Sequence, residues 1–190
     1  MNTLFSHVCV VTMDERMSVW TDAFVGVTDG KISYLSKHAP EEKPAQIIDA
    51  TGMVLMPGLI NCHTHLPMQL LRGYADDLKL QEWLNDYIFP REDRLDGRCV
   101  RAATTLAVAE CLKFGVTSVS DMYYFCDDIC DVIAKSGMKA NISRGTSMFL
   151  GDDFDFEKFP ACQELVALKN KWHNFDGGRI KIEASIHAEY

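Results

Sequence analysis

Two histidines, His63 and His65, are the residues of this sequence best suited to do chemistry. They follow an apolar segment, and side chains at positions i and i+2 of a β-strand point to the same face of the sheet. Two imidazoles on one face can bind a single metal ion from one side. A catalytic zinc ion usually has at least three protein ligands, so this pair predicts half of a metal site.

The seven cysteines are predicted to be reduced thiols. Their number is odd, and their spacing lacks the density that is typical of disulfide-rich domains. Cys126 and Cys130 are separated by one helical turn. They are therefore either metal ligands or small apolar residues of a helix.

The composition is that of a globular protein, with 190 residues of which 47% are hydrophobic. The net charge of −8 disfavours binding to nucleic acid or to anionic lipid, which select clustered Lys and Arg. No apolar run approaches the roughly 20 residues of a membrane span, and the N-terminus lacks the pattern of a signal peptide. We therefore expect a cytoplasmic protein that binds a small neutral or weakly charged molecule.

Residues 1–52 predict a small antiparallel β-structure. A glycine-containing turn at 28–30 separates two of the expected strands, as in a hairpin. So few strands cannot enclose a core alone, so this region should pack against further sequence. The expected strands cover residues 8–13, 23–27, 31–35 and 47–49.

Residues 53–190 alternate between strand and helix patterns, which indicates parallel β/α units. The first strand region is expected to combine Met53–Met56 with Leu59–Asn61. Gly115 is the expected end of the longest helix. Four strands of this kind make half of a (β/α)8 barrel. The further strands are expected at 116–119, 140–142 and 180–186, and the helices at 80–88, 96–114, 129–135 and 164–172.

Polar residues lie at the ends of these strands, where the active sites of parallel barrels are found. His63 and His65 follow the first strand, and Asp121, Arg144 and His187 follow the others. Asp121 is either a site residue or a helix cap. The C-terminal ends of four strands thus predict one functional face.

Short motifs occur in order along nearly the whole chain, and with them the sequence resembles the amidohydrolase superfamily. The resemblance is to the branch of deaminases that act on S-adenosylhomocysteine, 5-methylthioadenosine and related amino-heterocycles, together with chlorotriazine hydrolases. The motifs are Pro57-Gly58-Leu59-Ile60-Asn61-Cys62-His63-Thr64-His65, Leu71-Arg72-Gly73, Glu82-Trp83-Leu84, Pro90-Arg91-Glu92-Asp93-Arg94-Leu95, Gly115-Val116-Thr117, Asp121-Met122-Tyr123, Ser143-Arg144-Gly145 and His187-Ala188-Glu189-Tyr190.

The resemblance implies an α/β fold, with the N-terminal part of a metal-dependent (β/α)8 TIM barrel preceded by a partial β-sandwich. Residues 1–52 would supply the sandwich strands and residues 53–190 the first half of the barrel. His63 and His65 would be the first two ligands of one divalent ion, zinc or alternatively iron. Further ligands and the catalytic residues are expected beyond residue 190, so the isolated chain is expected to be inactive.

Four further residues are implied to bind the substrate. Trp83 would stack on a flat heterocycle, or else be an ordinary apolar helix residue. Glu92 would accept hydrogen bonds from a ribose diol, or else be a first-turn helix acid. Arg144 would bind an anionic group, or else form a structural ion pair. His187 would contact the substrate, or else be a buried histidine of the core.

The implied activity is hydrolytic deamination of an amino-substituted purine nucleoside or a related heterocycle. Related nucleoside deaminases often carry a second arginine after the position of Arg144, where this sequence has acidic residues. That difference favours uncharged 5-methylthioadenosine over S-adenosylhomocysteine, whose amino-acid tail needs an anchor. The alternatives are a guanine or cytosine deaminase, a triazine hydrolase, or a non-catalytic half-barrel that binds partners. Relatives are commonly oligomers, so a homo-oligomer of the full-length form is also expected.

Overall fold

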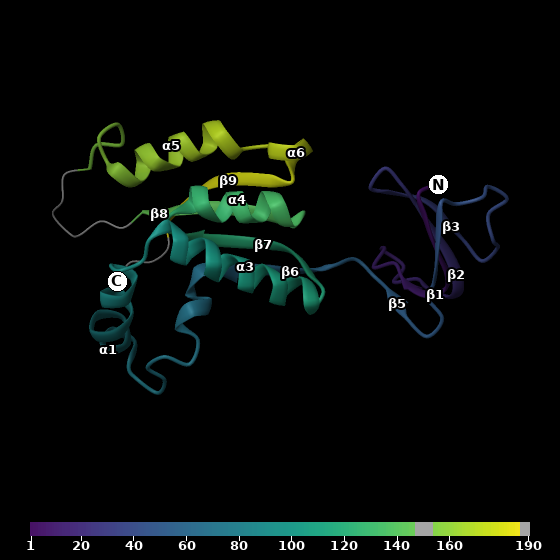
Figure 1. The fold of residues 1–190 in the computed structure, drawn as a ribbon, viewed down its shortest axis with the longest axis horizontal. Coiled ribbons are helices and arrows are strands. Elements are labelled where there is room, and N and C mark those ends of the chain that lie inside the picture. The colour runs from purple at the N-terminus through teal and green to yellow at the C-terminus, as the bar shows by residue number, and fades with distance from the viewer. Residues whose placement is uncertain (147–153, 187–190) are drawn as a thin grey trace. The chain divides into compact units, whose positions relative to one another are not determined.

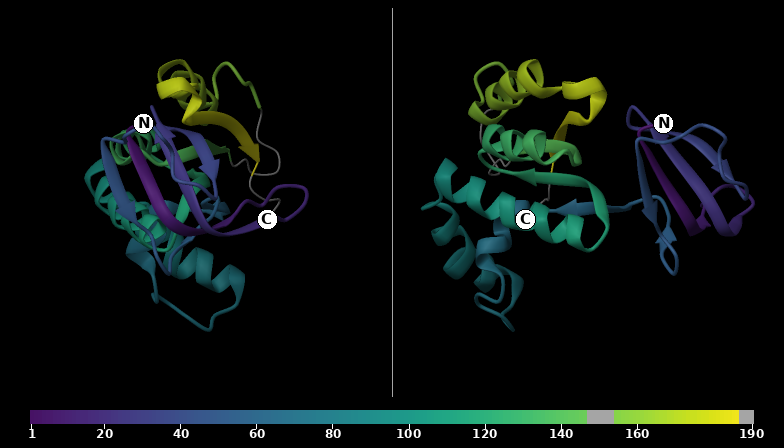
Figure 2. Two further views of the ribbon diagram at one scale, coloured as in Figure 1. Left: turned by 90° about the vertical axis from the view of Figure 1, so that its right-hand side faces the viewer. Right: turned by 45° about the vertical axis from the view of Figure 1, so that its right-hand side comes forward.

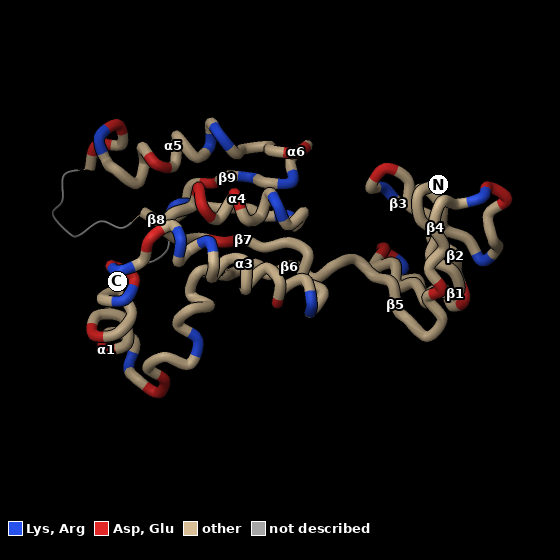
Figure 3. The backbone as a smooth tube through the Cα atoms, in the orientation of Figure 1, with Lys and Arg blue, Asp and Glu red and all other residues tan. Residues whose placement is uncertain are grey.

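The computed structural model describes residues 1–146 and 154–186 and divides into two compact units, Met1–Pro57 and Gly58–Tyr190 (Figure 1). The first unit is built from strands, and the second alternates strands with helices. Lys and Arg are interspersed with Asp and Glu along both units (Figure 3). Within the described residues, no helix combines the length and apolar character needed to cross a membrane.

The N-terminal unit is one mixed sheet in the order β3-β2-β1-β4, with β5 also paired to β1. The hairpin partners β1, β2 and β3 are antiparallel, as the sequence predicts, whereas β4 and β5 run parallel to β1. This sheet is formed largely by the residues for which the sequence predicts a partial β-sandwich. The strands are β1 (Thr3–Val11), β2 (Val19–Thr28), β3 (Lys31–Ser36), β4 (Gln46–Asp49) and β5 (Val54–Leu55).

Alternate residues of β1 point into the small core of this unit. Val8 and Val10 are buried there against Ala23 and Val25 of β2 and against Ala50. The two-residue period of burial is what a sheet with one packed face requires. The register of β1 is therefore fixed by its own apolar pattern.

The expectation that Met53–Met56 belongs to the first strand of the parallel unit is wrong. Val54 and Leu55 instead pair with Cys9 and Val10 of β1. A tight turn, closed by the Met53 N–H donating to the Ala50 carbonyl at 2.9 Å, returns the chain to the N-terminal sheet. A short apolar run fits either sheet, so its pattern alone could not identify its partner.

The second unit contains four parallel strands in the order β6-β7-β8-β9. Helical segments connect successive strands, as parallel pairing demands, and Figure 2 shows this sheet with its helices from two directions. The strands are β6 (Leu59–Thr64), β7 (Val116–Tyr123), β8 (Lys139–Thr146) and β9 (Ile180–Ile186), and the longer helices are α3 (Gly97–Lys113), α4 (Cys126–Ser136) and α5 (Pro160–Trp172). The predicted strand and helix alternation is confirmed.

The segment between β6 and α3 is more broken than the single helix predicted for residues 80–88. A π-helical turn stands at its centre, where the Phe89 N–H donates to the Leu84 carbonyl. Pro90 follows at once and has no N–H to continue the α-helical ladder. The elements are the 3-10 turn η1 (Leu66–Leu71), α1 (Leu80–Glu82), the π turn η2 (Trp83–Ile88) and α2 (Phe89–Glu92). A short helix α6 (Phe175–Gly178) precedes β9.

Local signals fix the ends of α3. The Asp96 carboxylate accepts the Cys99 N–H at 2.8 Å, which satisfies a first-turn amide. Gly115, with φ of +80°, follows the last turn in a conformation that suits glycine. The helix predicted at 96–114 is confirmed as α3, which spans Gly97–Lys113 and is flanked by Asp96 and Gly115.

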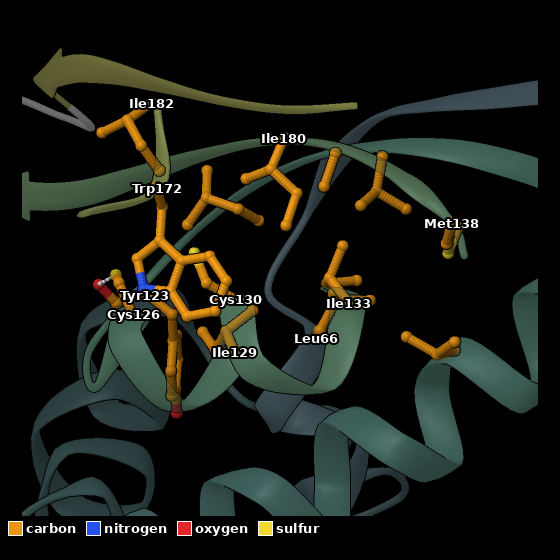
Figure 4. Packing of buried hydrophobic residues seen from close by; sticks show 14 of the residues in the cluster. Leu66, Tyr123, Cys126, Ile129, Cys130, Ile133, Met138, Trp172, Ile180 and Ile182 are labelled. Carbon is orange, nitrogen blue, oxygen red and sulfur yellow. Dashed lines mark hydrogen bonds between the residues drawn. The ribbon is translucent and has the colours of Figure 1, made fainter. Parts of the chain in front are cut away.

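The main core lies between the sheet and helices α3, α4 and α5. Figure 4 shows Tyr123, Cys126, Ile129 and Cys130 in this cluster, together with Trp172. Alternate residues of β7, from Val119 to Tyr123, are buried on this face. Asp121 lies between those two residues and shares their face, so a carboxyl group is buried in an otherwise apolar layer.

Candidate functional site

His63 lies at the C-terminal end of β6 and His65 directly after the strand, where the sequence predicts half of a metal site. Their Nε2 atoms are 3.4 Å apart and their ring planes cross at 85°. Two zinc–nitrogen bonds of about 2.0–2.1 Å at a tetrahedral angle would place the nitrogens about 3.3–3.4 Å apart. The pair is therefore arranged as two ligands of one ion would be.

The ring of His65 is oriented by a hydrogen bond to the backbone of β7. Nδ1 of His65 lies 2.6 Å from the Met122 carbonyl oxygen. Because a carbonyl can only accept, Nδ1 carries the proton and Nε2 carries the lone pair that a metal ion needs. Metal-binding histidines commonly have such a partner on the second nitrogen. This contact was not anticipated, because sequence spacing does not reveal which carbonyl faces a ring.

Asp121 supports the same turn. Its side chain is 1% exposed, and Oδ1 accepts the Leu66 N–H at 2.7 Å, directly after His65. Burial raises the pKa of Asp121 to about 7, although the hydrogen bond from Leu66 acts in the opposite direction. Asp121 thus caps the first turn of η1, which follows His65, rather than the helix that follows β7.

Glu92 belongs to the same neighbourhood through Tyr123. The Tyr123 hydroxyl donates to Glu92 Oε1 at 2.6 Å, and the Tyr123 ring centroid lies 6.3 Å from that of His65. Partial burial raises the pKa of Glu92, against the lowering effect of the Tyr123 hydrogen bond. Tyr123 was missed as a site residue, although it shares the face of Asp121 two positions earlier.

Trp83 lies at the start of η2 and is half-buried. This placement keeps part of its indole ring accessible, as stacking on a ligand would require. Stacking of Trp83 on a substrate stays a prediction.

Arg144 lies in β8 and is held by neighbours within the chain. Its Nε donates to Glu164 Oε2 at 2.5 Å, and its guanidinium lies 4.9 Å from the centroid of the Tyr124 ring. Arg144 also donates to the carbonyl of Gly145. The structural ion pair that the sequence left open is thus formed, and a substrate contact by Arg144 stays a prediction.

His187 lies outside the described residues. Within 1–146 and 154–186, no group of three or more His, Cys, Asp or Glu side chains is placed to hold a metal ion. Among the described residues, only the two predicted ligands His63 and His65 are thus brought together.

Cys126 and Cys130 belong to α4 and are buried in the core. Burial raises the pKa of the Cys126 thiol to about 12 and that of Cys130 as well, so neither is a thiolate near neutral pH. Metal binding requires the thiolate, so the structure favours their role as small apolar residues.

The turn after the histidines is also clamped to α3. Arg72 donates to both carboxylate oxygens of Glu110, at 2.8 and 2.6 Å, and Gln69 donates to the same carboxylate at 2.7 Å. Arg72 in turn donates to Gln69 at 2.7 Å. The hydrogen bonds from Arg72 and Gln69 lower the pKa of Glu110. Arg72 of the Leu-Arg-Gly motif thus holds the segment that follows His63 and His65.

Known proteins resemble the whole chain. It is 34% identical over its full length to a 5-methylthioadenosine/S-adenosylhomocysteine deaminase of Thermoanaerobacter pseudethanolicus, and covers 43% of that protein. It is 38% identical over 88% of its length to a 5'-deoxyadenosine deaminase of Methanosphaera stadtmanae, and covers 39% of that protein. The chain thus spans less than half the length of the relatives it matches.

Solved structures agree with these relatives. An adenosine deaminase of Xanthomonas campestris with bound zinc matches 98% of this chain with a TM-score of 0.85 at 31% identity, over 43% of its own length. The zinc complex of the atrazine chlorohydrolase TrzN from Arthrobacter aurescens matches 96% of this chain with a TM-score of 0.85, over 46% of its own length. At 20% identity, the latter match concerns the fold alone.

One family profile covers the whole of the second unit. The sequence profile of the Amidohydrolase family matches residues 54–190. That range includes the four parallel strands β6 to β9 and the two histidines at the end of β6. With these observations, the chain belongs to the amidohydrolase family.

Proposed function

We propose that this chain forms the first half of a metal-dependent deaminase that removes the amino group from an adenine nucleoside by hydrolysis. The observation that carries the proposal is the pair His63 and His65, whose Nε2 atoms lie 3.4 Å apart at the end of β6. Relatives named as 5-methylthioadenosine/S-adenosylhomocysteine and 5'-deoxyadenosine deaminases support the reaction class. The first half of a (β/α)8 barrel is the architecture we assign to the second unit.

His63 and His65 would hold one divalent ion, for which we favour zinc over iron because zinc is bound in the related adenosine deaminase of Xanthomonas campestris. Such an ion, when bound, makes hydroxide available from water near neutral pH. The hydrogen bond from His65 Nδ1 to the Met122 carbonyl keeps the other ring nitrogen directed toward His63. Further ligands and the proton-transfer groups would come from outside the described residues, so the 190-residue chain alone should not turn over substrate.

Glu92 is our candidate for binding the ribose hydroxyls. Its Oε1 accepts one hydrogen bond from Tyr123. A carboxylate has about four lone-pair sites, so acceptor capacity for a diol remains. Its pairing with Tyr123, whose ring neighbours that of His65, would bring the sugar close to the metal pair.

Trp83 would lie against the base, and its half-buried ring suits one face of a flat heterocycle. His187 would contact the substrate from the end of β9. Both assignments follow the family motifs in which these residues stand.

The preferred substrate would have an uncharged 5'-substituent. An anionic tail needs a cation that is available to pair with it. Arg144 already donates to Glu164 and stacks on Tyr124. A methylthio or methyl group at the 5' position needs no such partner, so 5-methylthioadenosine and 5'-deoxyadenosine are favoured over S-adenosylhomocysteine.

The test is an assay of the protein expressed from the complete reading frame that contains this sequence. Ammonia release would be measured with 5-methylthioadenosine, 5'-deoxyadenosine, S-adenosylhomocysteine, guanine and cytosine. Chloride release would be measured with a chlorotriazine, and each assay would be run with zinc added and after chelation. We expect zinc-dependent release from the first two nucleosides. Turnover of guanine, cytosine or the triazine alone would assign a different substrate. If no compound is turned over and chelation of zinc leaves the stability of the protein unchanged, a non-catalytic protein would be favoured.

A further inference from the structure

The motif Asp121-Met122-Tyr123 at the end of β7 contacts the region of the metal pair through its first two residues. Asp121 binds the Leu66 N–H and Met122 binds the His65 ring. These two contacts hold consecutive residues of one turn, His65 and Leu66. The end of β7 thus forms a frame for the second histidine of the pair.

The turn at His65 lacks a local cap. His65 is the N-cap residue of η1, and its side chain makes no capping hydrogen bond. An N-cap side chain normally accepts an N–H of the first turn, but the His65 ring is directed to Met122 and His63 instead. Leu66 is 3% exposed, so its N–H needs a partner from within the protein. Asp121, 55 residues away in sequence, provides that acceptor.

Folding stability alone does not account for a carboxyl group at position 121. The side chain is 1% exposed, and its Oδ2 has no hydrogen-bond partner among the described residues. Burying a carboxyl with one oxygen unpaired destabilises a protein relative to an apolar side chain of similar size. The neighbours of Asp121 on the same face of β7, Val119 and Tyr123, belong to an apolar cluster.

We propose that Asp121 is a positioning residue for the metal site, which fixes the backbone at Leu66 so that His65 keeps its ring on the Met122 carbonyl and its Nε2 toward His63. Asp121 acts through the backbone and binds no metal itself. The inference rests on the proposed function only in taking His63 and His65 as metal ligands. Loss of the Leu66 contact would let the turn after His65 move and would weaken its bond to Met122.

The test uses Asp121→Ala and Asp121→Leu, which remove the acceptor, and Asp121→Asn, whose amide oxygen can still accept the Leu66 N–H. Val119→Ala is the matched control, because it removes buried atoms from the same face of the same strand without touching Leu66. The protein is expressed from its complete reading frame. Zinc affinity is measured by competition with a chelator, and the His65 tautomer by ¹⁵N NMR of the metal-free protein.

We expect Asp121→Ala and Asp121→Leu to weaken zinc binding about 10- to 100-fold, as removal of partners of metal ligands does, and to convert His65 from the Nδ1–H form to a mixture of tautomers. Asp121→Asn should keep the Nδ1–H form and most of the affinity. Val119→Ala should lower the melting temperature and change neither readout. Should one acceptor-free variant fail to fold, the other and Asp121→Asn still decide.

Zinc affinity and tautomer unchanged in the acceptor-free variants would overturn the proposal and leave Asp121 a structural residue. An equal loss in Asp121→Asn would overturn it as well, since the Leu66 bond would then not be the cause. If the wild-type protein binds zinc and releases no ammonia from any nucleoside, the proposed substrate class fails while both readouts remain decisive. If it binds no zinc, the metal assignment fails and the tautomer still tests the role of Asp121.

Discussion

The ends of β7 and β8 both carry charged or polar side chains, but these are used differently. At the end of β7, Asp121 and Met122 bind groups in the turn that follows β6. At the end of β8, Arg144 is bound by Glu164 of α5, the helix that follows it. The hydrogen bonds of Asp121 and Met122 thus reach the candidate metal pair, whereas the Arg144 side chain pairs with Glu164 of the helix that follows its own strand. A polar residue at a strand end is therefore a site candidate only when its partners lead to the site.

The largest effect is expected from loss of a metal ligand. His63→Ala and His65→Ala each remove one nitrogen of the pair, and a site with one ligand fewer loses more affinity than one that loses a supporting hydrogen bond. Zinc content of the purified full-length protein should fall to background, and ammonia release with it. The matched control is His173→Ala, a histidine that contacts the backbone of Ile182 in β9. Retention of stoichiometric zinc by both variants would contradict the assignment of His63 and His65 as metal ligands.

The next largest effect is expected at Tyr123, whose hydroxyl donates a hydrogen bond to Glu92. Tyr123→Phe keeps the buried ring and removes a hydrogen bond to a carboxylate, an interaction of about 1.5–3 kcal/mol. We expect KM for 5'-deoxyadenosine to rise about tenfold with zinc affinity unchanged. Steady-state kinetics should be compared with a 2',3'-dideoxy analogue, which lacks the diol and should show no such rise. An equal change for both nucleosides would mean that Glu92 does not bind the sugar.

The order of the strands and helices around this site could be predicted from the sequence better than its hydrogen bonds could. Apolar strand runs and the helix between Asp96 and Gly115 predicted the order of the β/α units, because burial and capping are local signals. His63 and His65 were found because their spacing on a strand fixes their common face. The bonds of Asp121 and Met122 join residues 55 and 57 positions apart. Such pairs depend on the strand register, which no local pattern encodes.

The same limit explains two other outcomes. Val54 and Leu55 joined the N-terminal sheet because a short apolar run carries no information on its partner strand. Arg144 could be interpreted as a ligand-binding or a structural residue, because the position of Glu164 in α5 relative to β8 is a tertiary feature. Chemistry-bearing residue types were thus visible in the sequence, and their partners were not.

A smaller effect is expected at the end of β8. Glu164→Gln removes the charge that pairs with Arg144, and a partly exposed ion pair contributes about 0.5–1 kcal/mol. The melting temperature should fall slightly, while kcat/KM for 5-methylthioadenosine should stay near that of the wild type. Relative turnover of S-adenosylhomocysteine should rise, because the guanidinium becomes available to its carboxylate. A loss of 5-methylthioadenosine turnover instead would show that β8 supports the site as β7 does.

The smallest effect is expected at the clamp between Arg72 and Glu110, which holds the turn after the metal pair from the outside. Hydrogen bonds from Arg72 and Gln69 lower the pKa of Glu110, so the folded state binds fewer protons at this site than the unfolded state. Its contribution to stability is therefore present above the ordinary glutamate pKa and is lost as the pH falls through the lowered value. Glu110→Gln should reduce thermal stability slightly at pH 7 and converge with the wild type in acid. Melting curves across this pH range, with Lys135→Gln as a control in a separate exposed ion pair, would test the sign. A difference in melting temperature between Glu110→Gln and the wild type that grows in acid would contradict this sign. The turn after His65 would then be held by the β7 contacts alone.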